Sequence, residues 1–472
     1  MGLVDSLEDR FDVQEHGSSV RTEVLAGLTT FLTMSYIVVV NPAILSGAIT
    51  PQGVSQGEVQ SMLAVVTIIA AATATLVMAL YANRPFAQAP GLGLNAFFAF
   101  TVVGALGVPW QTALAAVVVE GILFILLTAV GAREYVIGLF PEPVKFAVGT
   151  GIGLFLAIIG LQAMGIVVGD ETTLVTLGSV ASNPVAILSV IGLFLTFALY
   201  ARNVPGSIII GIVLTTAIGM LATFLGIVAP GTLAIEAIGN GSVNPAALPD
   251  ATYDITPIAG AFIGGLANVE AFTFALVVFT FFFVDFFDTA GTLVGVGQAG
   301  GFLDEDGELP DIDRPLMADA VGTTVGGALG TSTVTTYIES ASGVEEGGRT
   351  GLTALTVAGL FVVSLVLVPL ATAIPLYASH IALVVIGVVM LRNVVDIEWN
   401  DLTHSIPAGM TILIMPFTYS IAYGIAAGIV SYPLVKLAAG EGRDVRIGHW
   451  ALAGAFVVYF VVRTGGVLTG QL

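Results

Sequence analysis

The chain has 472 residues, of which 33 are acidic and 13 are basic, and its formal net charge is −20. Hydrophobic residues make up 56% and charged residues only 10%, whereas about 25% charged residues is usual in soluble domains. This balance excludes a soluble globular protein and a disordered chain, and the acidic surface excludes a nucleic-acid partner. The absence of cysteine excludes disulfides and thiolate metal sites. Composition therefore predicts an all-α polytopic membrane protein.

The first 19 residues are polar and acidic and lack the basic-then-apolar order of a signal peptide. Fourteen apolar runs follow, and each is predicted to be a transmembrane segment or part of one. Those beside Pro90–Gly91 and Thr331–Thr336 are short and are predicted to be half-helices. A further run, 449–462, either crosses the membrane or lies at its interface. The fourteen runs lie at 24–45, 61–82, 92–107, 111–131, 144–163, 184–201, 206–228, 270–297, 317–330, 337–345, 351–370, 375–391, 405–418 and 419–436.

Basic residues occur in every second loop, and the loops 46–60, 164–183 and 228–268 contain none. This alternation places the N-terminus in the cytoplasm. The longest loop without a basic residue separates two sets of seven runs, and because seven is odd the two sets form inverted repeats. The expected organisation is a cytoplasmic segment at 1–19, a first repeat at 20–228, an extracellular linker at 229–268, a second repeat at 269–437 and a C-terminal segment at 438–472.

Carboxylates are concentrated in the cytoplasmic loop 303–314, and lysine occurs only twice in the chain. This pattern is typical of proteins from a high-salt cytoplasm, where screening reduces the repulsion between carboxylates. A solvated acidic loop explains the pattern equally well. The acidic residues of the loop are Asp304, Glu305, Asp306, Glu308, Asp311 and Asp313.

Two aspartates interrupt the apolar run 270–297. Asp285 and Asp288 are three residues apart, which places both on one helical face, and Thr289 lies one turn from Asp285. A carboxylate at the centre of a membrane helix costs roughly 2.5–3.5 kcal/mol on the lowest scales. The pair therefore indicates a substrate or ion site, and a polar contact that joins helices is the alternative.

A third carboxylate, Glu339, follows a run of hydroxyl side chains that ends at Thr336. A half-helix starting there would point its positive end into the membrane. The first half of the chain has a matching interruption, because Pro90–Gly91 breaks the run and Asn95 lies early in the next helix. Two interrupted segments at corresponding positions indicate a transporter site; two flexible loops are the alternative.

Two further carboxylates lie in apolar runs, and their roles stay open. Glu120 is expected to face the helix bundle, either as a hydrogen-bonding group or as a coupling group. Asp319 either caps its helix or contributes to function. No ATP-binding motif or catalytic triad is present, and the GxGxxG-like runs follow no strand, so we expect neither an enzyme nor a cofactor. The four histidines lack the HExxH spacing, and no metal site is expected.

Several stretches resemble the AzgA-like purine permeases, a branch of the nucleobase–ascorbate transporter superfamily. The resemblance covers nearly the whole chain, although the acidic loop and the scarcity of lysine depart from the family pattern. The stretches are VRTEVLAGLTTFLTMSYIVVVNP (20–42), APGLGLNAFFAF (89–100), FFFVDFFDTAGTLVGV (281–296), GTSTVTTYIESASGVEEGGRTGLTAL (330–355) and ILIMPFTYSIAYGIAAGIVSY (412–432).

The resemblance implies fourteen spans in two inverted sets of seven, with a core domain of spans 1–4 and 8–11 and a gate domain of spans 5–7 and 12–14. Spans 3 and 10 would each carry a short extended stretch before a half-helix, with the substrate between the two stretches. By motif position, Asp285 and Glu339 would bind the base near Asn95, and Asp288 would support the site. Related carriers are proton-coupled, and many are dimers.

We therefore expect a secondary active transporter in the plasma membrane that imports hypoxanthine, guanine or adenine with a proton. Carboxylates suit this substrate because they can accept two purine N–H groups. A sodium-coupled xanthine or uracil carrier, a sulfate or bicarbonate carrier of the same fold, and a channel stay open as alternatives. The expected substrate-binding residues are Asp285, Glu339, Asn95, Thr289 and Thr336, and the expected coupling or supporting residues are Asp288 and Glu120.

Overall fold

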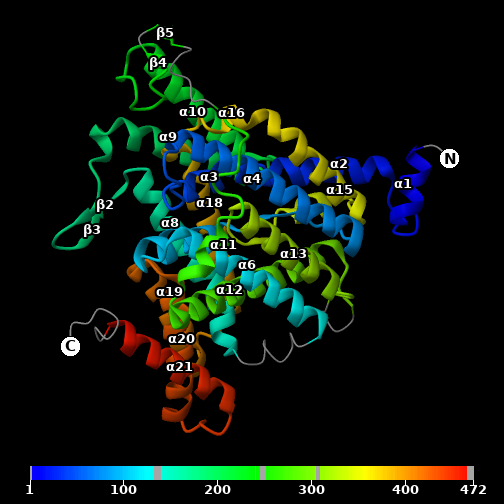
Figure 1. The fold of residues 1–472 in the computed structure, drawn as a ribbon, viewed down its shortest axis with the longest axis vertical. Helices are drawn as coiled ribbons and strands as arrows, with labels where there is room; N and C mark the ends of the chain where they lie inside the picture. Colours follow the sequence, from blue (N-terminus) through cyan, green and yellow to red (C-terminus); the bar gives the residue numbers. More distant parts are fainter. Residues whose placement is uncertain (1–2, 132–139, 240, 245–250, 305–308, 465–472) are drawn as a thin grey trace. The chain divides into compact units, whose positions relative to one another are not determined.

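The computed structural model describes residues 3–131, 140–239, 241–244, 251–304 and 309–464 (Figure 1). The chain divides into two compact units, a larger one within residues 1–129 and 159–385 and a smaller one within 130–158 and 386–472. Parts of five predicted segments lie outside the described residues. They are residues 1–2 of the N-terminal segment, 132–139 of the first repeat, 240 and 245–250 of the linker, 305–308 of the acidic loop and 465–472 of the C-terminal segment.

The predicted helical character is confirmed, because every predicted apolar run contains a helix. Among the described residues, ten helices are long and apolar enough to cross a bilayer. The other predicted segments are shorter helices at 92–105, 313–329, 340–345 and 402–418. The ten long helices are Val20–Leu45, Gln56–Ala82, Trp110–Ala129, Glu142–Ala163, Pro184–Ala201, Ser207–Phe224, Thr273–Gly300, Gly351–Ala371, Leu376–Asp396 and Ile421–Ala438.

The larger unit contains most of the helices, among them α6, α12 and α13, which pack against one another (Figure 1). In chain order its described helices are α1 (Leu3–Phe11), α2 (Val20–Met34), α3 (Ile37–Leu45), α4 (Gln56–Val77), η1 (Met78–Ala82), α5 (Leu92–Ala96), η2 (Phe97–Ala105), α6 (Trp110–Ala129), η3 (Val180–Ser182), α9 (Pro184–Ala201), α10 (Ser207–Phe224), α11 (Phe262–Gly265), η5 (Leu266–Asn268), α12 (Ala271–Gly300), α13 (Asp313–Leu329), α14 (Ser340–Glu345), α15 (Gly351–Ser364), η6 (Leu365–Leu367), α16 (Val368–Ala371) and α17 (Leu376–Ser379).

Side chains cap several of these helices. Ser55 and Glu58 form a reciprocal capping box at the start of α4, and Asn183 caps α9, which has proline at its first position. The helix α15 has a cap from a distant part of the chain. The carboxylate of Glu23 on α2, which is fully buried, accepts hydrogen bonds from the backbone N–H groups of Arg349, Thr350 and Thr353 at 3.0–3.2 Å. Glu23 therefore joins the start of α15 to α2.

Two β-hairpins lie in the loops 164–183 and 228–268, for which the sequence analysis gives no secondary structure. β2 (Val167–Asp170) pairs with β3 (Leu174–Leu177), and β4 (Ile238–Gly239) pairs with β5 (Ser242–Val243). In the first hairpin, the carboxylate of Asp170 accepts the N–H groups of Thr172 and Thr173 at 2.8 Å, which lowers the pKa of Asp170. Both strands of this hairpin are largely exposed, so they lack the apolar alternation by which a strand is recognised.

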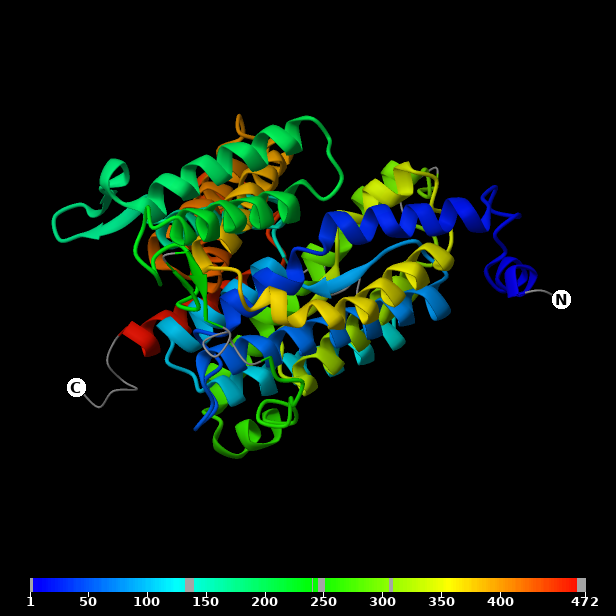
Figure 2. The same ribbon diagram turned by 90° about the horizontal axis from the view of Figure 1, so that it is seen from above.

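The smaller unit contains α19 (Leu402–Thr418), α20 (Ile421–Ala438) and α21 (Ile447–Thr464). The helix α20 packs against both of the others. Two further helices, α8 (Glu142–Ala163) and α18 (Ile381–Met390), are shared between the units. Figure 2 shows the same elements after a rotation of 90°. The helix α21 contains the run 449–462 whose course the sequence leaves open.

The pair α19 and α20 packs closely because of a left-handed residue and a glycine. Tyr419, with a φ of 54°, ends α19 and reverses the chain within two residues. A Cβ atom at Gly424 of α20 would lie 2.6 Å from the carbonyl oxygen of Thr411 on α19. Only glycine fits at that distance, as is common where membrane helices approach closely.

Candidate functional site

A pair of buried strands forms the centre of the candidate site, where the sequence analysis predicts two extended stretches. β1 (Gln88–Pro90) and β6 (Val334–Thr336) are antiparallel, with Gln88 opposite Thr336 and Pro90 opposite Val334. The half-helix α5 begins directly after β1, and α14 begins shortly after β6. The strands therefore join the two interrupted segments of the chain by main-chain hydrogen bonds.

Gly91, which follows β1, is required by the closeness of the two strands. A Cβ atom there would lie 2.5 Å from Cγ2 of Thr335 on the opposite strand. The N–H of Gly91 donates to the carbonyl oxygen of Thr333 at 3.0 Å and so extends the pairing by one bond. A larger residue would force the strands apart.

Asp319 of α13 joins the strand pair to the helices beneath it. Its Oδ1 atom accepts hydrogen bonds from the Thr289 hydroxyl at 2.8 Å, the Gln88 amide at 3.2 Å and the Thr336 hydroxyl at 3.4 Å. These donors come from α12, β1 and β6. The Thr289 hydroxyl is also hydrogen-bonded to that of Thr335 at 2.7 Å. Asp319 is therefore a buried carboxylate with several donors, rather than the cap of its own helix.

Glu120 of α6 and Asp285 of α12 form a second group with few donors. Both are fully buried, and they lie on helices that pack against each other, with Phe124 of α6 in ring contact with Phe282 and Phe286 of α12. Among the described residues, no N–H or O–H group donates to either oxygen of Glu120 or to Oδ1 of Asp285. Oδ2 of Asp285 is 3.5 Å from the hydroxyl of Thr323, which also donates to the Val334 carbonyl oxygen at 2.8 Å.

Glu339, directly before α14, and Asp288 of α12 are two further carboxylates of the site. The Oε1 atom of Glu339 accepts a hydrogen bond of 2.6 Å from the hydroxyl of Tyr36, which lies between α2 and α3. Asp288 of α12 interacts electrostatically with Glu339. Both carboxylates are half-buried, and no ion pair to either is recorded among the described residues. Asp288 and Glu339 can therefore offer several acceptor oxygens to a bound molecule.

Asn95 of α5 is fully buried and connects its half-helix to the other half of the chain. Its side-chain oxygen accepts a hydrogen bond from the hydroxyl of Ser332, and its amide group is 3.5 Å from the carbonyl oxygen of Pro90. The hydroxyl of Tyr337 donates to the same carbonyl oxygen at 2.6 Å. Asn95 thus lies at the end of the strand pair.

The structure brings all seven predicted site residues into one unit, but it separates them into groups. Asp285 faces Glu120, whereas the carboxylate beside Glu339 is Asp288. Thr289 and Thr336 both donate to Asp319. Their assignment to substrate binding stays a prediction.

The sequence analysis gave Tyr36 and Gln88 no role in the site. It left open whether Asp319 only caps its helix or contributes to function. For Asp319 the signal was present, because an aspartate inside an apolar helix is costly unless it has partners. For Tyr36 and Gln88 no local signal exists, since their partners are 303 and 231 residues away in the chain. Only the folded chain shows these contacts.

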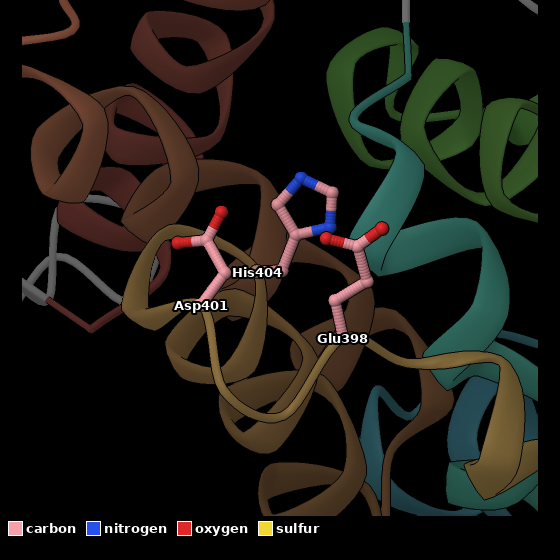
Figure 3. Close-up of side chains that lie close together, drawn as sticks. All are labelled: Glu398, Asp401 and His404. Atoms are coloured by element: carbon pink, nitrogen blue, oxygen red, sulfur yellow. The ribbon is translucent and has the colours of Figure 1, made fainter.

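The smaller unit has one close group of potential metal ligands among the described residues, at the start of α19. Ligand atoms of Glu398, Asp401 and His404 all lie within 4.8 Å of one another, and Figure 3 shows the three side chains around a common space. Asp401 accepts the N–H of Thr403 at 2.7 Å, which caps α19 and lowers the pKa of Asp401. Helix capping explains the position of Asp401 in this group.

The helical fold, the paired strands in the membrane region and the buried carboxylates define a membrane transporter. The transmembrane domain of the cyanobacterial bicarbonate transporter BicA has a similar fold, with a TM-score of 0.58 over 86% of this chain and 97% of that chain at 16% identity. This likeness supports the expected inverted-repeat architecture.

Residues 21–427 match the Permease family Xan_ur_permease, and the chain belongs to this family. Adenine permease AdeP of Escherichia coli K12 is 40% identical over 442 residues, which cover 93% of this chain and 92% of AdeP. Guanine/hypoxanthine permease PbuO of Bacillus subtilis 168 is 41% identical over 439 residues, which cover 92% of this chain and 96% of PbuO. The resemblance noted from the motifs is confirmed, and the protein is a multi-pass membrane transporter and not an enzyme.

Proposed function

We propose that the protein is a secondary active transporter that imports purine nucleobases with a coupling proton. The names of the related adenine and guanine/hypoxanthine permeases support the substrate class. The observation that carries the proposal is the pair of half-buried carboxylates, Asp288 and Glu339, beside the strand pair β1–β6. A neutral purine presents ring and exocyclic N–H groups, and a carboxylate can accept two of them.

In this proposal Glu339 accepts N–H groups of the base, and the Tyr36 hydroxyl fixes its orientation. Asp288 contributes a second acceptor, and Asn95 holds the strand ends against which the base binds. Each hydrogen bond to a charged acceptor contributes about 1.5–3 kcal/mol. Thr289 and Thr336 support the site through Asp319, because their hydroxyls donate to it.

The test is counterflow of labelled hypoxanthine, guanine and adenine in proteoliposomes that contain the purified protein. We expect purines to exchange and to compete with one another, and uracil and sulfate to have no effect. Sulfate or bicarbonate exchange without purine exchange would contradict the proposal. Carboxylates repel an anion, and among the described residues no basic side chain forms an ion pair with Asp288 or Glu339. The site therefore argues against an anion as substrate.

The coupling ion is also part of the proposal. A proton suits this site because it neutralises a carboxylate that would otherwise cross the hydrocarbon as a charge. Accumulation should then collapse when a protonophore is added and persist when sodium is omitted. The reverse result would support a sodium-coupled carrier.

Orientation and assembly follow from the sequence pattern and belong to the same proposal. The alternation of basic loops supports a cytoplasmic N-terminus in the plasma membrane. Transport would proceed by movement of a core (spans 1–4 and 8–11) against a gate (spans 5–7 and 12–14), in a dimer. Cysteine labelling at residue 171, in an otherwise cysteine-free chain, tests the orientation because this loop should react only from outside.

A further inference from the structure

Glu120 occupies a position at which an ionised carboxylate would be unusually unfavourable. It lies ten residues after the start of α6 at Trp110 and nine before its end at Ala129, at the middle of a span. It is fully buried, and neither of its oxygens receives a donor among the described residues. A buried charge without a partner costs several kcal/mol. The local structure therefore suits a carboxyl group that holds a proton.

Asp285 is the group that faces Glu120. A proton on one of two neighbouring carboxyl groups lets that group donate to the other, whereas two carboxylates offer acceptors alone and repel each other. Asp288 on α12 and Asp319 on α13 are the other titratable side chains that interact with this pair, and both are acidic. The elements η2, α11 and η5, which also pack on α6, contain no titratable residue.

Asp319 provides the contrast that separates a proton site from a structural carboxylate. Its Oδ1 atom receives three donors, whereas its Oδ2 atom receives none among the described residues. In the Glu120–Asp285 pair, Oδ2 of Asp285 has only a distant contact of 3.5 Å with the hydroxyl of Thr323, and Glu120 receives no donor among the described residues. Of these three buried carboxyl groups, the pair is where binding a proton relieves the most unfavourable charge.

The pair is also connected to the strands beside the proposed purine site. Thr323 approaches Asp285 and donates to the carbonyl oxygen of Val334 on β6. Asp285 is one helical turn from Asp288, on the helix that packs against α14, which begins directly after Glu339. A change of protonation at the pair can therefore alter β6 and Asp288 through directly packed groups.

We propose that the coupling proton is carried by the Glu120–Asp285 carboxyl pair, separately from the Asp288–Glu339 face that binds the base. A proton from the outer solution forms an O–H bond to one carboxylate oxygen, and the other carboxylate accepts that O–H. The same proton leaves to the cytoplasm after the base has been released. This inference rests on the proposed function and adds a coupling site to it.

The test compares wild-type protein with Glu120→Gln, Glu120→Asp and Glu171→Gln in proteoliposomes. An inward gradient of one pH unit supports about tenfold accumulation at one proton per base, because one unit is a tenfold ratio of proton activity. We expect this accumulation in the wild type and in the control Glu171→Gln, whose carboxylate lies exposed in the β2–β3 turn. Glu120→Gln should still exchange purine by counterflow but accumulate none, and purine-dependent proton uptake, followed with an entrapped pH dye, should be lost.

Glu120→Asp keeps a titratable group and should restore part of the accumulation, which a purely structural role would not predict. If Glu120→Gln does not fold, accumulation by Glu120→Asp is measured in its place. Accumulation by Glu120→Gln equal to that of the wild type would overturn the proton site and leave the proposed function standing. Absence of purine counterflow in folded wild-type protein would overturn the proposed function and the coupling role with it.

Discussion

The surroundings of Asp319 and of Glu120 show two uses of a buried carboxyl group in one helix bundle. Asp319 has donors from β1, α12 and β6 on a single oxygen, and it holds these elements together. Glu120 has none among the described residues and faces another acid. A carboxylate of the first kind stabilises the fold, whereas one of the second kind is retained at a cost in stability. The number of donors, rather than burial, distinguishes them.

The largest expected effect in this comparison is that of removing Asp319. In Asp319→Ala, the Gln88, Thr289 and Thr336 donors lose their acceptor, and we expect a loss of about 2–4 kcal/mol in the free energy of unfolding. Asp319→Asn keeps an oxygen at the same position and should lose about 1 kcal/mol. Thermal unfolding of both variants in detergent measures the difference. Equal losses would mean that the charge, and not the acceptor, matters.

The next effect concerns the proposed substrate face. Glu339→Gln replaces an acceptor by a group that is partly a donor, and we expect purine affinity to fall at least about tenfold, which is 1.4 kcal/mol of binding free energy. Tyr36→Phe removes only the hydroxyl that orients Glu339 and should cost less, about threefold. Binding of purines by thermal shift or calorimetry checks both. Unchanged affinity in Glu339→Gln would remove Glu339 from the binding site.

A smaller effect of opposite sign is expected at Glu120. Glu120→Met replaces an acceptor without donors by an apolar side chain of similar volume, and we expect the free energy of unfolding to rise by about 1 kcal/mol. The same variant should not accumulate purine in response to a pH gradient. Thermal unfolding at neutral pH is the measurement, with Glu171→Gln as the unchanged control. A marked loss of stability would show that Glu120 has a structural partner.

The smallest effect is expected for Asp401, a half-buried residue whose carboxylate caps α19. Because hydrogen bonds from Thr403 lower its pKa, its contribution to stability is present above the pKa of the unfolded chain and is lost as the pH falls through the folded value. Asp401→Ala should therefore unfold at a lower temperature than wild type near pH 7, and the difference should shrink below about pH 4. Asp401→Asn, which can also cap, should match the wild type at pH 7.

The sequence was sufficient for the helices, the two interrupted segments and the acidic residues within them. Hydropathy and chain-breaking residues such as Pro90 and Gly91 are local signals, and they predicted where α5 begins. The partners of the acids are not local. That Asp285 faces Glu120 depends on the packing of α12 against α6, and that Asp288 lies beside Glu339 depends on the position of α14. Helical spacing placed Asp285 and Asp288 on one face and could not separate their roles.

The hairpin β2–β3 shows a different limit of the sequence. Its residues are exposed on both strands, and the turn is set by Asp170 and by Leu174, which has a φ of 67°. A non-glycine residue in the left-handed region leaves little trace in composition. Such a hairpin is specified by a few hydrogen bonds rather than by a hydrophobic pattern.

The cap that Glu23 provides for α15 bears on the order in which the chain assembles during synthesis. Glu23 is synthesised 326–330 residues before Arg349, Thr350 and Thr353, whose backbone N–H groups donate to its carboxylate. Until then its carboxylate must stay hydrated near the membrane surface, and α2 cannot reach its final place. The first candidate membrane span of the chain is thus among the last to become fixed. Shortened chains that end before α15 should therefore be inserted poorly and degraded readily.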